Sequence, residues 1–139
     1  MSNFVFDMDG TLTYPGDRIH KHPLNVKRNK SVEDLWKNFY QGCSLDIPNI
    51  AVLNIAKNLN GNIFIITGRD ENARFETELW LKKNGLKPLK VYMRPLKDKR
   101  KVAEIKLEQI QDIISKHGNI SCIFDDDIRN IKIFKDYPT

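Results

Sequence analysis

Cysteine is scarce in this sequence, which contains only Cys43 and Cys122. Two isolated cysteines do not make a disulfide framework or a zinc site, so neither a disulfide-stapled secreted scaffold nor a zinc domain is indicated. Long hydrophobic runs are also absent. The apolar start Phe4–Phe6 is interrupted at once by Asp7, so the sequence predicts neither a signal peptide nor a membrane-spanning segment. We therefore expect a protein of a reducing, cytoplasmic compartment without a membrane partner.

The charge balance is moderate and excludes few partners. The chain has 139 residues, of which 40% are hydrophobic, and a formal net charge of +5. This length and hydrophobic content suit one core, so we expect residues 1–139 to form a single domain. A small basic excess attracts nucleic acid, nucleotides or phosphoesters, but it also serves solubility, and composition alone leaves both interpretations open.

Four short apolar runs alternate with longer stretches of helical periodicity. The runs lie at residues 3–8, 63–66, 89–93 and 120–124, and their apolar side chains are nearly continuous, which is typical of strands covered on both faces. Helices are predicted at about 50–59, 71–84 and 98–116, with a short helix after the last strand. Strands that alternate with helices indicate an α/β fold with a parallel sheet and helices on both faces.

Residues 14–47 interrupt this rhythm as an insertion after the first strand. The insertion holds a basic cluster (Lys27, Arg28 and Lys30) and an aromatic stripe (Trp36, Phe39 and Tyr40). A helix is predicted at about 32–41. Because the insertion leaves directly from the acidic end of the first strand, we favour a flap over a site, with a loop packed beside the sheet as the alternative. We interpret the aromatic stripe as packing rather than as a surface for base stacking.

Polar residues fall where the predicted strands end, and one lysine lies on the third predicted helix. The set consists of Asp7, Asp9, Thr67, Lys106, Asp125 and Asp126. Ligands of open parallel sheets bind outside the carboxyl ends of the strands, so these side chains are expected to converge. Clustered carboxylates favour a hard cation such as Mg²⁺. One Asp can attack phosphorus while a second acts as general acid and base, with Thr67 and Lys106 neutralising phosphoryl charge.

Other interpretations of the Asp7–Gly10 run are weaker. A calcium loop would need an acid at position 11 and a glycine at position 12, where Thr11 and Leu12 stand. Asp-Gly is also an ordinary turn signal. A purely structural turn is the less favoured explanation because further polar residues stand at the ends of the other predicted strands. No phosphate-binding P-loop motif is present, which argues against an ATP-using P-loop kinase.

In their order along the chain, these motifs resemble a known family. The motifs are Asp7–Leu12, then Arg18, Ile66–Arg69, Thr77–Leu81, Tyr92–Pro95, the spacing of Arg94, Asp98, Arg100 and Lys106, and finally Phe124–Asp126. They are similar to the haloacid dehalogenase (HAD) superfamily of phosphatases. Within it they resemble the phosphatase domain of phage polynucleotide kinase-phosphatase and related small phage phosphatases. The resemblance spans about residues 3–134, and it places the protein in the host cytoplasm if it is phage-encoded.

The resemblance implies a fold and a set of roles. The fold would be a three-layer, Rossmann-like HAD core with a parallel sheet of about four strands in the order 4-1-2-3 and a small cap or flap after strand 1. Asp7 would be the nucleophile, Asp9 the general acid and base, and Thr67 and Lys106 the holders of the phosphoryl group. Mg²⁺ would be held by Asp7, Asp9 (through its backbone carbonyl), Asp125 and Asp126. The substrate-binding residues would be Arg18, Arg69, Arg94 and Arg100. The alternative for these arginines is a structural role, as a solvated loop charge, a helix cap or a member of a surface ion pair.

Two departures from the family pattern qualify this prediction. Asp127 stands where the phage branch has Arg, and the predicted sheet has a bare edge at which a second copy of the chain would be able to pair. The sequence therefore predicts an Mg²⁺-dependent phosphomonoesterase that acts through an aspartyl-phosphate and removes 3′-phosphates from nucleic-acid ends. A small-molecule nucleotidase (5′- or 3′-) and a non-enzymatic nucleic-acid-binding module on the same fold remain the alternatives.

Overall fold

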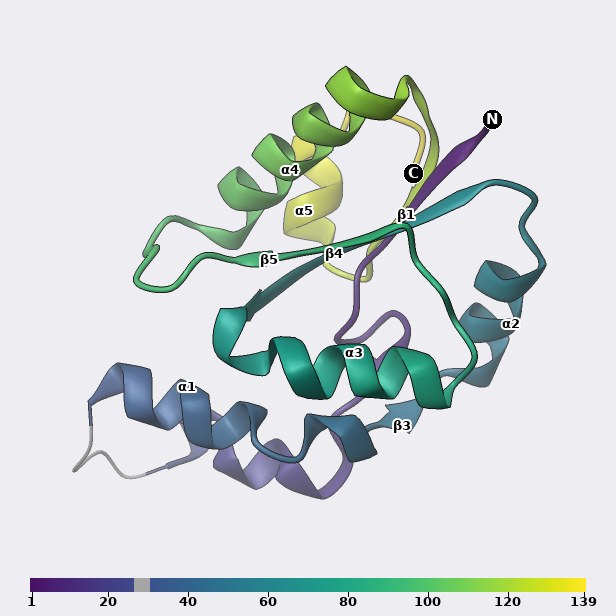
Figure 1. The fold of residues 1–139 in the computed structure, drawn as a ribbon. Coiled ribbons are helices and arrows are strands. Elements are labelled where there is room, and N and C mark those ends of the chain that lie inside the picture. The colour runs from purple at the N-terminus through teal and green to yellow at the C-terminus, as the bar shows by residue number, and fades with distance from the viewer. Residues whose placement is uncertain (27–30) are drawn as a thin grey trace.

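A computed structural model describes residues 1–26 and 31–139, so the basic cluster Lys27, Arg28 and Lys30 lies outside the described residues. Strands, helices and 3-10 turns (η) follow one another along the chain (Figure 1). Their order is β1 (Asn3–Phe6), β2 (Thr13–Tyr14), η1 (Gly16–Lys21), η2 (Pro23–Asn25), α1 (Val32–Tyr40), η3 (Cys43–Leu45), β3 (Ile47–Pro48), α2 (Ile50–Asn58), β4 (Asn62–Asp70), η4 (Glu71–Ala73), α3 (Arg74–Lys83), β5 (Lys90–Arg94), α4 (Val102–His117), β6 (Ile120–Phe124) and α5 (Ile128–Ile133).

Four parallel strands form the main sheet, in the spatial order β6-β1-β4-β5. When these four strands are numbered along the chain, the order is 4-1-2-3, as expected. The parallel α/β architecture confirms the predicted Rossmann-like core. At the outer edge of β6, the backbone N–H of Ile123 donates to the carbonyl of Pro138, so the C-terminal segment covers part of that edge. Pairing with a second copy at an open edge stays a prediction.

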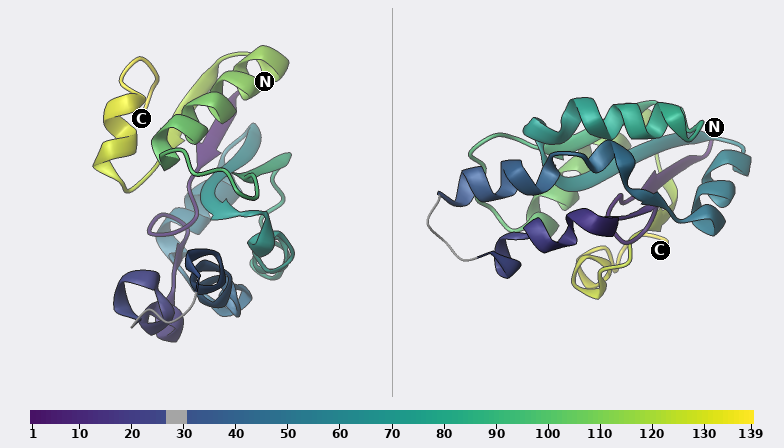
Figure 2. Two further views of the ribbon diagram at one scale, coloured as in Figure 1. Left: turned by 90° about the vertical axis from the view of Figure 1, so that its left-hand side faces the viewer. Right: turned by 90° about the horizontal axis from the view of Figure 1, so that it is seen from below.

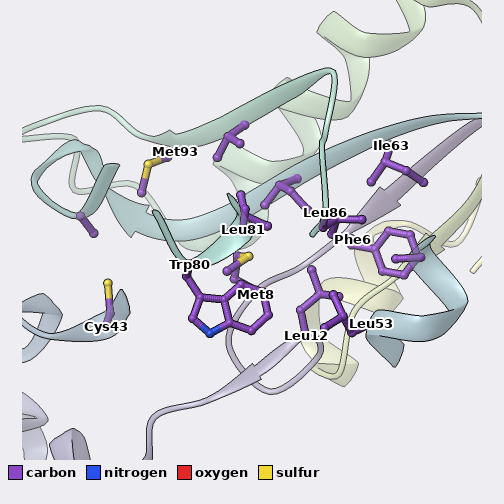
Figure 3. Close-up of a cluster of buried hydrophobic side chains, with 14 of the residues drawn as sticks. Phe6, Met8, Leu12, Cys43, Leu53, Ile63, Trp80, Leu81, Leu86 and Met93 are labelled. Atoms are coloured by element: carbon purple, nitrogen blue, oxygen red, sulfur yellow. The ribbon is translucent and has the colours of Figure 1, made fainter. Parts of the chain in front are cut away.

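Helices cover both faces of the sheet because its strands carry apolar side chains on both faces. Phe6 and Ile65 point toward α2 and α3, in a core that includes Leu53 and Leu81 (Figure 3). The alternate strand residues face α4 and α5, where they pack against Ile110, Ile113 and Phe134. These two cores give the three layers seen in Figure 1.

The insertion is closed at its base by a small antiparallel ribbon. Thr13 of β2 pairs with Pro48 of β3, and Tyr14 pairs with Ile47, so the chain leaves and returns at the same place beside the sheet. Between these strands, α1 begins at Ser31, whose hydroxyl accepts a hydrogen bond from the Asp34 N–H. Figure 2 shows α1 and η1 grouped together on one side of the core. The part of the chain between β2 and β3 lies within the insertion predicted at 14–47, and those bounds stay a prediction. That residues 1–139 act as one domain stays a prediction.

Two predicted boundaries were wrong, for local reasons. The first strand ends at Phe6 rather than at residue 8, because the following backbone turns at once. The helix predicted from residue 98 begins only at Val102. Before it, the Arg94 guanidinium donates to the carbonyls of Asp98 and Arg100 at 2.8 and 2.7 Å, and Lys97 adopts a φ of 65°. These contacts hold residues 95–101 as a loop.

Some apolar side chains of the helices are exposed. Phe75 of α3 is 77% exposed, and Ile50 and Ile55 of α2 are 59% and 46% exposed. Only one stripe of each of these short helices meets the sheet, and these three residues lie outside it. Cys122 is half-buried, whereas Cys43 is fully buried in the core. No helix in residues 1–26 and 31–139 combines the length and the hydrophobicity needed to cross a bilayer.

Candidate active site

A tight turn after β1 places the first two candidate residues. The Asp7 N–H donates to the carbonyl of Phe124 on β6 at 2.9 Å, and the Met8 carbonyl then accepts from three successive N–H groups, those of residues 11–13. Gly10 has a φ of +84°, and a Cβ there would lie 2.2 Å from Oδ2 of Asp126. Glycine is therefore required both by the backbone conformation and by the close approach of the acidic loop after β6.

Asp7 lies in a buried ion cluster with Lys106 and Asp125. The Lys106 Nζ donates to Asp7 Oδ1 at 2.7 Å and to Asp125 Oδ2 at 2.8 Å, and all three side chains are less than 10% exposed. Burial raises the pKa of Asp7 to about 7, with a further contribution from Asp125, although Lys106 opposes the shift. Burial alone would lower the pKa of Lys106, but the two carboxylates raise it above its ordinary value. The lysine therefore stays charged between the two carboxyl groups.

Three carboxylates gather at this point. One oxygen each from Asp7, Asp125 and Asp126 lies within 4.8 Å of the others. The Thr11 hydroxyl lies 3.3 Å from both Asp7 Oδ2 and Asp126 Oδ1, and the Asn130 amide donates to Asp125 Oδ2 at 3.0 Å. An all-oxygen donor set that carries more negative than positive charge suits a hard divalent cation such as Mg²⁺. The residues present therefore fit the metal that the family pattern implies.

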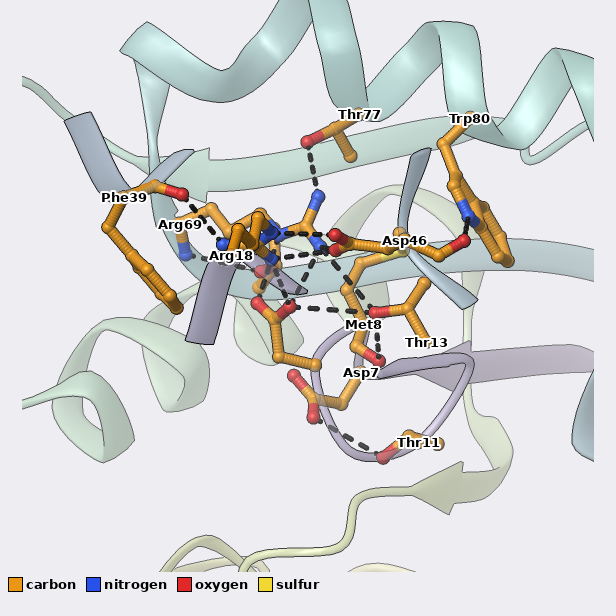
Figure 4. A network of polar contacts seen from close by, with 12 residues as sticks. Asp7, Met8, Thr11, Thr13, Arg18, Phe39, Asp46, Arg69, Thr77 and Trp80 are labelled. Carbon is orange, nitrogen blue, oxygen red and sulfur yellow. Dashed lines mark hydrogen bonds and ion pairs between the residues drawn. The ribbon is translucent and has the colours of Figure 1, made fainter. Parts of the chain in front are cut away.

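The side chain of Asp9 is bound by two arginines, Arg69 and Arg18, which Figure 4 shows beside Asp46. Arg69 binds it in a bidentate fashion, with Nε donating to Oδ2 at 2.9 Å and Nη2 to Oδ1 at 2.7 Å, and Arg18 Nη2 lies 3.4 Å from Oδ1. Burial favours a raised pKa for Asp9, but the charges and hydrogen bonds of Arg69, with help from Arg18, outweigh it and hold the pKa below its usual range. Since the Asp9 side chain is 42% exposed, it remains accessible from the pocket.

Asp46, which sequence reasoning missed, completes this network from the insertion. Its carboxylate accepts from Arg18 Nε and Nη2, both at 2.6 Å, and from Arg69 Nη2 at 2.9 Å. Its backbone carbonyl accepts from the indole N–H of Trp80 at 2.8 Å. The remaining arginine donors are also used, because Arg18 Nη1 donates to the Phe39 carbonyl and Arg69 Nη1 to the Thr77 hydroxyl, each at 2.9 Å. Both arginines are thus buried partners of carboxylates, and the substrate contact predicted for them stays a prediction.

The other three predicted residues have recorded partners other than Asp7. Thr67 is 1% exposed, and its hydroxyl accepts from the Arg69 N–H at 3.1 Å. Arg94 binds the backbone of the loop at 95–101, as described above. Arg100 is exposed and forms ion pairs with Asp98 and Glu108. The structure therefore brings together Asp7, Asp9, Lys106, Asp125 and Asp126 around one pocket, and the roles predicted for these and for Thr67, Arg94 and Arg100 stay predictions.

A pocket of about 340 Å³ opens onto the cluster. Its floor includes Asp7, Asp9 and Lys106, and its wall includes Trp36 and Phe39 of the insertion. The insertion thus lies where the predicted flap would lie, beside the acidic residues. Thr11 and Asn130 were not among the predicted site residues. Thr11 belonged to a recognised motif, whereas nothing in the sequence pointed to Asn130.

Comparisons with known proteins found a matching family model and similar solved structures. The family model described as "Polynucleotide kinase PNKP phosphatase domain" matches residues 2–137. Two solved structures, of "the Pnkp1/Rnl/Hen1 RNA repair complex" and of the "Pnkp1/Rnl/Hen1 complex", each contain a chain with a TM-score of 0.71 and 21% identity. The matches cover 96% and 99% of this chain but 39% and 44% of those chains, so this chain spans less than half of their length. At this identity the likeness establishes the fold. Among curated proteins, no sequence matches.

Proposed function

The chain belongs to the family of polynucleotide kinase PNKP phosphatase domains, and from this premise we propose that it is an Mg²⁺-dependent phosphomonoesterase that removes 3′-phosphates from nucleic-acid ends. The proposal rests on one observation, which is that two aspartates line the same pocket but have different partners. Asp7 is buried against Lys106, whereas Asp9 is bound by Arg69 and stays open to the pocket. Two carboxylates in such different environments suit two different chemical roles.

Asp7 is the proposed nucleophile. An oxygen of its carboxylate attacks phosphorus, the bond between phosphorus and the leaving oxygen breaks, and the product is an aspartyl-phosphate. Lys106 already lies 2.7 Å from Asp7, so its ammonium is placed to neutralise charge on the transferred group. In the second step, water attacks the same phosphorus, the bond to Asp7 breaks, and phosphate leaves.

Asp9 is the proposed general acid and base. It would give a proton to the leaving oxygen in the first step and take one from the attacking water in the second, so its proton count is restored after one cycle. The two arginines favour the ionised form of Asp9, which is the form that the second step needs. Bound phosphate brings negative charge close to Asp9, which favours the protonated form that the first step needs.

The residues proposed to hold Mg²⁺ are Asp7, Asp125 and Asp126, together with the backbone carbonyl of Asp9. When bound, the metal would supply positive charge to the phosphoryl oxygens. Asn130 and Thr11 keep Asp125 and Asp126 oriented by their hydrogen bonds. Gly10 leaves room beside Asp126 that a side chain would fill.

A phosphate-release assay tests this function and separates it from its alternatives. The substrates are mononucleotides and oligonucleotides with a 3′- or a 5′-phosphate, each with Mg²⁺ and with EDTA. We expect release from 3′-phosphorylated oligonucleotides that EDTA abolishes. Release from mononucleotides alone would favour a nucleotidase. Binding of oligonucleotides without release from any substrate would favour a non-enzymatic module and contradict the proposal.

A further inference from the structure

A second cleft adjoins the catalytic pocket. It has a volume of about 680 Å³ and lies between α1 and the loop at residues 95–101, and we refer to it as the α1–loop cleft. Four residues line both cavities, namely Trp36, Tyr40, Gly68 and Val102. The cleft therefore adjoins the catalytic pocket, and a molecule whose phosphate lies at Asp7 can extend past these shared walls into the cleft.

One wall of the cleft is aromatic and held in place from behind. Trp36 is half-buried and packs on Tyr40, with ring centroids 5.7 Å apart and planes inclined by 27°. The rings of His22 and Phe39 meet it edge-on, with centroids 5.2 and 5.9 Å away. Three neighbours thus fix the indole, and its remaining surface lines the cleft. An aromatic surface that is already oriented loses little conformational freedom when a flat ligand stacks on it.

The opposite wall is apolar at its base and basic at its rim. Pro95 and Val102 line the cleft, and Lys97 and Lys99 are exposed along its edge. Within the described ranges, no ion pair is recorded for either lysine, whereas Asp98 between them is paired with Arg100. The loop itself is held by the Arg94 guanidinium. Three acidic residues also line the cleft. Asp70 accepts from the Asn72 N–H, Asp98 accepts from Arg100, and Glu33 is exposed on α1, so the positive charge of the rim comes from Lys97 and Lys99 on the loop.

We propose that the α1–loop cleft binds the nucleoside that carries the phosphate under attack, with its base stacked on Trp36 and the next backbone phosphate near Lys97 and Lys99. This inference rests on the proposed phosphatase function and names how the same site would recognise a nucleic-acid end. The combination of a flat aromatic face, an apolar counter-wall and a basic rim matches a nucleotide, because every base has a face that stacks and every linkage carries a negative charge. It also revises the interpretation of Trp36 as packing alone.

Kinetics with two matched substrates test the stacking. One is a 3′-phosphorylated oligonucleotide with a normal terminal base, and the other is the same strand ending in an abasic sugar. For the wild type we expect a KM about 10-fold to 100-fold lower with the base present. Trp36→Ala should raise KM on the normal end toward the abasic value, with little change in kcat or in cleavage of the abasic end, and Trp36→Phe should restore most of the preference. Equal KM values for the normal end in wild type and Trp36→Ala would overturn the proposal.

A binding measurement separates failure of this inference from failure of the phosphatase function. Asp7→Asn protein is titrated with the 3′-phosphorylated oligonucleotide while tryptophan fluorescence is followed. The chain has two tryptophans, and Trp80 is 1% exposed, so a stacked base should quench Trp36 alone. We expect quenching in Asp7→Asn that disappears in Asp7→Asn/Trp36→Phe. If wild type lacks phosphatase activity but Asp7→Asn shows this quenching, only the enzyme proposal is contradicted. If wild type releases phosphate but Asp7→Asn shows no quenching, only the cleft proposal is contradicted.

Discussion

Replacement of Asp7 by Asn is expected to lower the rate of phosphate release by about three orders of magnitude or more, because an amide cannot act as the attacking group. The substitution keeps the shape of the side chain. It also removes one of two buried carboxylates that share Lys106, while Asp125 still pairs with the lysine at 2.8 Å. We therefore expect the variant to stay folded. Phosphate release with Mg²⁺ and the thermal unfolding midpoint are measured on the same preparation.

Asp136→Asn is the matched control for Asp7→Asn. Asp136 is an exposed aspartate near the C-terminus and does not line the catalytic pocket. The substitution makes the same chemical change outside the cluster, so the activity and the unfolding midpoint of this variant should equal those of wild type. Wild-type activity in a folded Asp7→Asn protein would exclude Asp7 as the nucleophile. Loss of activity together with loss of folding would instead show that Asp7 is needed for the structure, contrary to the expected result.

Arg69→Met is expected to have the largest effect on stability. The Arg69 side chain is 1% exposed and is shared between Asp9 and Asp46, with a third bond to the Thr77 hydroxyl. Methionine fills a similar volume but leaves the Asp46 carboxylate, itself 1% exposed, with Arg18 as its partner. Removing one member of a buried ion network costs about 3–5 kcal/mol, since it leaves charge buried without full compensation. Unfolding by urea, followed by circular dichroism, measures the loss.

Arg100→Met provides the comparison for this result. Arg100 is exposed and pairs with Asp98 and Glu108 at the surface, where ion pairs contribute little. We expect no measurable change in its unfolding free energy. If Arg69→Met were as stable as Arg100→Met, the buried network would not hold the insertion to the core. Arg69 would then be free for the substrate contact predicted from the sequence.

The sequence predicted the four strands because each contains a short apolar run, whereas the order 4-1-2-3 followed from the resemblance to the HAD superfamily. The carboxylate cluster was predictable for the same reason, since Asp7 and Asp125 directly follow such runs. Asp46 was not predictable. It lies in an insertion without regular periodicity, and its partners Arg18 and Arg69 are 28 and 23 residues away in sequence.

The direction of the side chains was the second feature that the sequence did not predict. In an extended strand, Asp7 and Asp9 would point the same way because they are two residues apart. The backbone instead turns from Met8 onward, and Asp7 contacts Lys106 while Asp9 contacts Arg69. In the same way, an arginine in a strand-end motif looks equally suited to bind substrate or a neighbouring carboxylate. The positions of Asp9 and Asp46 in space favour the second role for Arg69.

The stereochemical course at phosphorus tests most directly the central claim that Asp7 becomes phosphorylated. The measurement uses a 3′-phosphate made chiral by sulfur and oxygen isotopes, with Mg²⁺ and isotopically labelled water, and determines the configuration of the released thiophosphate. Each in-line displacement inverts phosphorus, so transfer first to Asp7 and then to water predicts net retention. Net inversion would show that water attacks the substrate directly and would contradict a covalent role for Asp7.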